Sequence, residues 1–185
     1  FSWPGQAASC DMCTHSQVAL DEAKHFSMWA QRLVDLGSEY GELKGHDGLW
    51  QSATETAGDL LSRLVIVHMV HEARGLDVTP NMLKKLAKSS DAESEAILRA
   101  NYAEEITHVG AGAKWFVHQA GQQQHDPQQL PALFKGYVKR FFKGSLKPPF
   151  NAQARAAAPV APAAVAAAPA RGHICLDLGE GENTD

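Results

Sequence analysis

Two pairs of side chains in this sequence have the residue types and the spacing of a metal site. Glu22 and His25 stand three residues apart, and Glu105 and His108 repeat the arrangement. Because residues three apart lie on one face of a helix, each pair presents a carboxylate and an imidazole in the same direction. Carboxylate and imidazole groups together are suitable ligands for iron and manganese. The two pairs therefore indicate a centre for one of these metals if both faces point inward.

Apolar residues at helical spacing place both pairs on faces that a folded chain buries. A lone glutamate, Glu72, stands on a third stripe of the same kind. Burying a carboxylate is costly unless it is paired or bound to metal, so three inward glutamates favour a shared cation. The stripes are marked by Val18, Trp29 and Leu36 for the first pair, by Leu98, Gly112 and Trp115 for the second, and by Leu61, Val65 and His68 for Glu72.

This combination matches the ligand pattern of di-iron and di-manganese helical bundles. In those bundles each of two helices supplies Glu-x-x-His, and each of two others supplies one glutamate. We therefore predict a di-iron or di-manganese centre in which Glu22 and Glu105 bridge the metals. His25 and His108 would each bind one metal, and Glu72 would be a terminal ligand.

Each piece of this pattern also has a plainer interpretation. A single Glu-x-x-His occurs readily by chance, and Glu104 makes the second motif part of a charged run. On that interpretation the pairs are ordinary charged groups at the surface. His68 and His71, next to Glu72, are expected to orient ligands or to pack rather than to bind metal. His46 lies in a loop, where a structural turn is favoured over catalysis.

The composition is that of a globular domain. The chain has 185 residues, of which 44% are hydrophobic and 21% charged, with a net charge of −4 and no strongly basic block. Nucleic acid is therefore not an expected partner, and no apolar run approaches the roughly 20 residues of a membrane span.

Three cysteines, an odd number, favour a reducing compartment. We expect the cytoplasm or an organelle matrix such as the mitochondrial one, since the missing initiator Met indicates a cleaved leader or a fragment.

Helical periodicity dominates the body of the chain, and no alternating strand pattern persists. Gly37 and Gly75 are each expected to end a helix. Pro80 is expected at the first position of a short helix capped by Thr79, and the sequence from Ser90 to Glu93 reads as a capping box. The expected helices cover residues 14–36, 49–74, 80–88, 90–119 and 128–142.

The ends of the chain differ from its helical body. We expect an N-terminal extension over 1–13, in which Cys10 and Cys13 are incidental thiols rather than a zinc or redox site. The helical domain is expected over 14–150. Residues 151–170 are almost entirely Ala, Pro and Val, which predicts an extended linker. An acidic tail over 171–185 follows, with a short apolar patch at 174–176 that either packs on another surface or is disordered.

Several strings in the chain resemble the DUF455 family, a group of ferritin-like proteins. The resemblance implies a ferritin-like four-helix bundle and places metal ligands on Glu22, His25, Glu72, Glu105 and His108. It implies oxidoreductase-like chemistry only by analogy with other ferritin-like proteins. The matching segments are residues 21–26, 40–41, 46–50, 72–80, 105–109 and 147–151.

One part of the family pattern is missing. The family has a helix before the segment at 21–26, and that helix carries a sixth ligand, a glutamate. Here the roughly 20 residues before Glu22 include Pro4 and Gly5 and contain no glutamate. We therefore expect another protein chain, within a larger complex, to supply or replace this helix. The alternatives are a site that has lost its metal, or closure of the groove by the chain's own residues 128–142.

The expected function is that of a metal-binding, ferritin-like subunit, with or without redox activity. The alternative is a non-catalytic structural subunit of a larger assembly that keeps the fold. Whether a glutamate from a neighbouring chain completes the site distinguishes the two.

Overall fold

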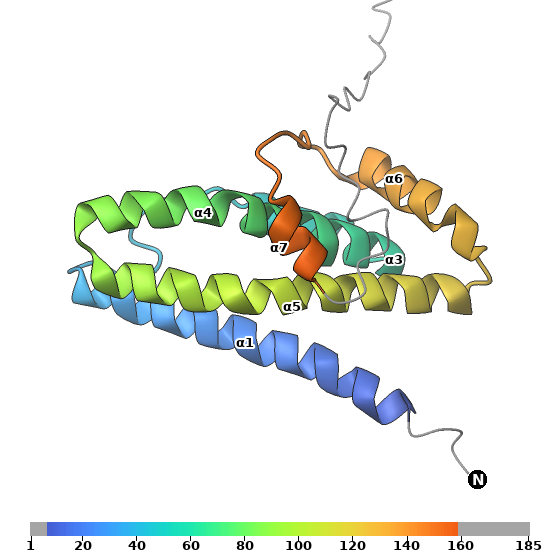
Figure 1. Ribbon diagram of the computed structural model, residues 1–185, viewed down its shortest axis with the longest axis horizontal. Coiled ribbons are helices and arrows are strands. Elements are labelled where there is room, and N and C mark those ends of the chain that lie inside the picture. The colour runs from blue at the N-terminus through green and yellow to red at the C-terminus, as the bar shows by residue number, and fades with distance from the viewer. Residues whose placement is uncertain (1–6, 159–185) are drawn as a thin grey trace, which may run out of the picture.

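The computed structural model describes residues 7–158, with side chains from Ser16 onward, and this part of the chain contains helices and no strands (Figure 1). The predicted all-α class is confirmed. Expectations for the tail at 171–185 lie outside the described residues, as do the side chains of Cys10 and Cys13. The elements are α1 (Ala7–Asp35), α2 (Gly48–Glu55), α3 (Leu60–Arg63), the π-helix η1 (Leu64–His71), α4 (Glu72–Ser89), α5 (Ala92–Gln122), the 3-10 helix η2 (Pro127–Gln129), α6 (Leu130–Phe141) and α7 (Ala152–Ala157).

Three long rods form the body of the molecule. They are α1, the continuous run of α3, η1 and α4, and α5, which packs between the other two (Figure 1). α1 and α4 run in the same direction, and α5 runs opposite to both. None of the described helices combines the length and the apolarity needed to cross a membrane. The bundle therefore has three rods where four would enclose its interior.

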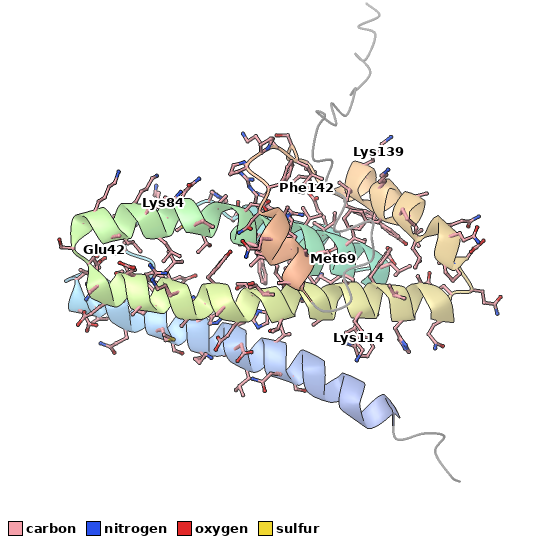
Figure 2. The ribbon with its side chains drawn as sticks, viewed as in Figure 1. Glu42, Met69, Lys84, Lys114, Lys139 and Phe142 are labelled. Carbon is pink, nitrogen blue, oxygen red and sulfur yellow. The ribbon has the colours of Figure 1, made fainter. Side chains whose placement is uncertain are left out.

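The main apolar core lies where η1, α5 and α6 meet. Met69 and Phe116 are almost completely buried there. In Figure 2 Met69 lies inside the bundle, whereas Lys84 and Lys139 project away from it. α6 packs on this core through Leu133, Phe134, Tyr137 and Phe141. The alternative in which residues 128–142 close the groove is therefore wrong, because their apolar face packs against η1 and α5.

The second rod differs from the predicted helices at both ends. The predicted helix over 49–74 is interrupted between Glu55, where α2 ends, and Leu60, where α3 begins. The Asp59 carboxylate caps α3 by accepting hydrogen bonds from the backbone amides of Leu61 and Ser62. The helix then continues through Gly75 and Pro80 to Ser89, so the predicted stop and restart are wrong. Glycine and proline disfavour a helix by about 1 and 3 kcal/mol. Burial of Ala73, Leu76 and Leu83 on this helix offsets that cost, since a large apolar side chain contributes about 1.5–3 kcal/mol.

The predicted C-terminal end of α1 is right, and the predicted N-terminal cap of α5 is one residue out. Gly37 adopts φ +80°, and the amides of Gly37 and Ser38 donate to the carbonyls of Val34 and Leu33, which is the glycine-based ending expected. α1 begins at Ala7, before the predicted start. The cap of α5 is Asp91 and not Ser90, because the Asp91 carboxylate accepts from the Ser94 amide at 2.9 Å.

The start of the predicted Ala/Pro linker is a short helix packed on the bundle. α7 is capped by Asn151, and Ala154 and Ala158 are buried against α4 and α5. The Arg155 guanidinium makes two hydrogen bonds, of 2.8 and 2.6 Å, to the buried Asp77 carboxylate. An extended conformation over 152–157 was therefore the wrong expectation, because a buried ion pair holds this segment.

Candidate metal centre

The register between α1 and α5 is fixed by one arginine near the C-terminal end of α1. The Arg32 guanidinium donates to Asp91 at 2.8 Å, to Glu93 at 2.5 Å and to the Ser94 hydroxyl at 3.1 Å. These acceptors are in or next to the first turn of α5, so the end of one helix is tied to the start of the other. This register places Glu22 and His25 opposite the middle of α5.

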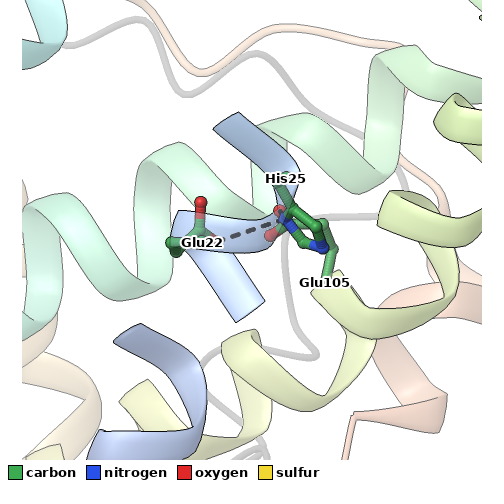
Figure 3. A group of neighbouring side chains, drawn as sticks. All are labelled: Glu22, His25 and Glu105. Atoms are coloured by element: carbon green, nitrogen blue, oxygen red, sulfur yellow. Dashed lines mark ion pairs between the residues drawn. The ribbon is translucent and has the colours of Figure 1, made fainter. Parts of the chain in front are cut away.

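Four of the five predicted ligands meet between α1 and α5. Figure 3 shows Glu22 and His25 on α1 next to Glu105 on α5. One ligand atom from each of these three residues lies within 4.8 Å of the others. His25 Nδ1 is 3.8 Å from both Glu22 Oε1 and Glu105 Oε1. His108 Nδ1 is 3.0 Å from Glu22 Oε1 and 3.7 Å from Glu105 Oε2. Both carboxylates therefore contact both imidazoles.

The electrostatics of this cluster favour a positive charge. His25 and His108 are only 5% and 1% exposed. Burial lowers the pKa of the His108 imidazole, but hydrogen bonds to Glu105, Glu22 and Asp21 outweigh it and raise that pKa to about 10. The hydrogen bond with His108 in turn lowers the pKa of the Glu22 carboxyl. The carboxylates thus stabilise a cation in a place where burial alone would exclude one.

Glu72, the fifth predicted ligand, faces the same groove but stands apart from the cluster. Its Oε1 lies 3.0 Å from His68 Nδ1 on the preceding turn. Its Oε2 is buried and has no hydrogen-bond partner among the described residues. Burial raises the pKa of this carboxyl. Glu72 therefore has one buried oxygen without a hydrogen bond among the described residues, while its other oxygen contacts His68.

The π-helix η1 leads directly into Glu72. A π-helix has a wider turn than an α-helix, and such segments are frequent at functional sites. Its close approach to α5 depends on Gly112, because a Cβ there would lie 2.7 Å from the His68 carbonyl oxygen. Sequence reasoning missed η1, since residues 64–71 read as an ordinary buried helical run.

A groove of about 600 Å³ runs beside the cluster, between α1 on one side and η1 with α4 on the other. Glu22, Glu72, Glu105 and His108 line it, together with small and apolar residues that include Val18, Ala19, Val67, Gly75, Ala111 and Gly112. On α1 three large apolar side chains are exposed: Leu20, Phe26 and Val34 are 65%, 52% and 58% exposed. One side of the cluster is therefore open along a mainly apolar groove.

Three polar residues of this region were missed from the sequence. Glu104 Oε2 lies 2.6 Å from His25 Nε2, and Asp21 Oδ2 lies 3.3 Å from His108 Nε2. Lys24 contacts both of these carboxylates. The available signal is an acidic residue directly before each inward glutamate, but from the sequence Glu104 reads as part of a charged run and nothing singles out Asp21. Their effect on the histidines depends on how the two helices face each other.

Two further histidines have structural contacts. His46 Nδ1 accepts from the Gly48 amide at 3.2 Å, which supports the interpretation of this loop as a turn. His71 Nε2 lies 2.9 Å from the Ser52 hydroxyl, and its ring packs edge-on against Phe142. His71 therefore joins η1 to α2.

The family pattern described as a protein of unknown function, DUF455, matches residues 13–166. The chain belongs to the DUF455 family. A protein from Haemophilus influenzae, described as uncharacterized, is 41% identical over 100 residues, which are 54% of this chain and 35% of that protein. The aligned part thus spans about a third of that relative. No solved structure matches the chain.

Two of the segments that carry the DUF455 resemblance meet in space. The Arg74 guanidinium donates to the carbonyls of Lys147 and Pro149, at 2.9 and 3.2 Å. The Asp77 carboxylate accepts from the Asn151 amide at 2.8 Å. Residues 72–80 therefore bind residues 147–151 and hold the start of α7, besides lining the groove through Glu72, Gly75 and Thr79.

Proposed function

We propose that this DUF455 protein binds a di-metal centre of iron or manganese. The observation that carries the proposal is the position of the Glu22 and Glu105 carboxylates between the buried rings of His25 and His108. A mixed set of carboxylate oxygens and imidazole nitrogens suits Fe and Mn. The unpartnered Oε2 of Glu72 adds a buried oxygen that a cation would satisfy.

The residues of this chain have distinct tasks in the proposed centre. Glu22 and Glu105 would hold both metals, since each carboxylate contacts both rings. His25 and His108 would each hold one metal through the nitrogen that faces these carboxylates, and Glu72 would bind from the groove side. When bound, such a centre supplies Lewis-acid and one-electron redox chemistry.

We further propose that a helix from another protein chain fills the groove and completes the centre. Small residues on both walls, including Ala19 and Gly75, leave room for a helix backbone. Phe26, one turn after Glu22 on α1, is exposed, and each large apolar side chain that such a helix removes from water contributes about 1.5–3 kcal/mol. Glu72 Oε2 is available to share a cation with a carboxylate on that helix.

The alternative is a structural subunit that keeps the bundle without a working centre. The observation in its favour is that Glu72 stands apart from the cluster while the Glu22 side chain is half exposed. Such a subunit would still need a helix in the groove, so the metal content separates the two functions.

The test is metal analysis after loading with Mn²⁺ or, without oxygen, with Fe²⁺. The wild-type chain is expected to bind two ions, and Glu105→Ala is expected to release most of the metal because a bridge serves both ions. Glu95→Ala, ten residues earlier on α5 and paired with Arg99, should leave the metal content unchanged. A wild-type protein that binds neither ion would overturn the metal centre and leave the structural subunit.

A further inference from the structure

A second layer of charged side chains lies behind the two histidines. The Nε2 atom of His25, on α1, is 2.6 Å from Glu104 of α5. The Nε2 atom of His108, on α5, is 3.3 Å from Asp21 of α1. Each ring is therefore contacted from behind by the acidic residue that precedes the inward glutamate of the opposite helix.

Lys24 connects the two outer carboxylates. Its Nζ lies 2.5 Å from Glu104 Oε1 and 3.5 Å from Asp21 Oδ1. A continuous arc thus runs from His108 through Asp21, Lys24 and Glu104 to His25. Lys24 is partly exposed, with 45% of its side chain accessible, whereas both rings at the ends of the arc are buried.

The chemistry of a carboxylate determines what this arc does to the rings. An ionised carboxylate only accepts hydrogen bonds, so a ring nitrogen that faces one carries a proton. In His108 this holds for both nitrogens, because Nδ1 also lies 3.0 Å from Glu22 Oε1. A cation bound between Nδ1 and the inner carboxylates would replace the Nδ1 proton, while the proton on Nε2 stays in place. A neutral imidazole has a single N–H, and the other nitrogen then keeps a lone pair for a metal. In both rings the other nitrogen is Nδ1, the atom that faces Glu22 and Glu105.

We propose that the arc of Asp21, Lys24 and Glu104 fixes His25 and His108 as Nδ1 metal ligands. Asp21 and Glu104 are positioning residues that hold the proton on Nε2 and the plane of each ring, and Lys24 holds the two carboxylates together. Because each carboxylate comes from the opposite helix, the rings are aligned only when α1 and α5 are in register. The inference rests on the proposed metal centre and adds to it which nitrogen binds and why.

The test uses Zn²⁺ as a diamagnetic probe and protein labelled with ¹⁵N in its histidine rings. Two-bond ¹H–¹⁵N correlation spectra show which ring nitrogen carries metal and which carries the proton. In the wild-type chain both rings are expected to have zinc on Nδ1 and hydrogen on Nε2. Glu104→Ala should disturb only His25, and Asp21→Ala only His108, with zinc affinity about 10–100-fold lower in each case.

Conservative variants show whether Asp21 and Glu104 orient the histidine rings or only stabilise the fold. Glu104→Gln and Asp21→Asn keep a carbonyl oxygen that accepts from Nε2–H, so they are expected to restore the Nδ1 pattern that the alanine variants lose. Asp35→Asn, at the exposed end of α1, should change neither ring. Far-UV circular dichroism of each metal-free variant reports whether α1 and α5 remain folded.

Three results would count against the proposal. Zinc on Nε2 of either ring in the wild-type chain would overturn the arc and leave the metal centre standing, and so would alanine variants in which both ring patterns persist. A wild-type chain that takes up none of Zn²⁺, Mn²⁺ or Fe²⁺ would overturn the metal centre and the arc with it.

Discussion

Individual side chains set both the charge and the spacing of the cluster. Hydrogen bonds to three carboxylates outweigh burial and raise the pKa of the His108 ring to about 10. Gly112 acts by size, since its missing side chain lets η1 come close to α5 beside Glu72. Substitutions at such points are expected to have larger effects than substitutions of the exposed residues nearby.

Gly112→Ala is expected to lower the free energy of unfolding by about 1–3 kcal/mol, the usual effect of overpacking. The added Cβ would lie 2.7 Å from the His68 carbonyl and 2.9 Å from the His68 Cβ, so η1 must move away from α5. Urea denaturation followed by circular dichroism measures the change.

Gly121→Ala on the same helix is the matched control, because nothing lies within 4 Å of a Cβ at that position. It is expected to stabilise the protein by up to about 1 kcal/mol through helix propensity alone. Equal denaturation midpoints for the two variants would show that the close approach at Gly112 does not exist in solution.

At the scale of elements, buried contacts determine how far α4 extends and where α7 packs. Local helix propensity alone would favour neither. The Asp77 side chain is fully buried, and it receives the Arg155 guanidinium and the Asn151 amide. Asn151 also donates to the Leu76 carbonyl and to the Tyr102 hydroxyl. The segment from 147 to 157 is therefore an integral part of the bundle.

Asp77→Ala is expected to destabilise the protein by about 3–5 kcal/mol, because it leaves the Arg155 charge buried without its partner. Arg99→Ala removes an exposed pair with Glu95 on α5 and is expected to change stability by less than about 1 kcal/mol. Thermal or urea unfolding compares the two. Similar losses in both variants would mean that α7 does not pack on α4 as described.

At the scale of the whole molecule, the described residues form three rods, with a well-filled core at one end and an open groove at the other. Large apolar patches are uncommon on soluble monomers and mark interaction surfaces. Here a groove lined by the proposed ligands runs beside α1, and Leu20, Phe26 and Val34 on that helix are exposed. The groove and the exposed apolar residues of α1 are therefore the surfaces at which a further helix is expected to pack.

The chain alone, at low concentration, is therefore expected to associate with itself or to lose structure, and light scattering with circular dichroism tests this. Ala19→Trp is expected to weaken association through the groove because Ala19 lines it. Ala103→Trp, at an exposed position of α5 outside the groove, should have little effect. A stable, well-folded monomer of 185 residues would show that no covering helix is needed.

The sequence alone was enough for the helical class, the DUF455 membership and the inward direction of the two Glu-x-x-His pairs. Apolar residues repeated at 3.6-residue spacing indicate which face of a helix is buried. Gly37 indicates where α1 ends, because glycine readily adopts the positive φ of that position. The five predicted ligands follow from this pattern, and four of these side chains meet in the structure. Glu72 was placed on the right face, but its distance from the cluster was not predictable.

Features that depend on contacts between two helices were determined only by the tertiary structure. α4 passes through Gly75 and Pro80, α7 packs by way of Arg155, and Asp21 and Glu104 reach the rings of the opposite helix. The low helix propensities of glycine and proline, about 1 and 3 kcal/mol below alanine, favour a break in the helix at Gly75 and Pro80. They are overridden because burial and buried ion pairs act between residues far apart in the chain, and the free energy of those contacts is not encoded in any local pattern.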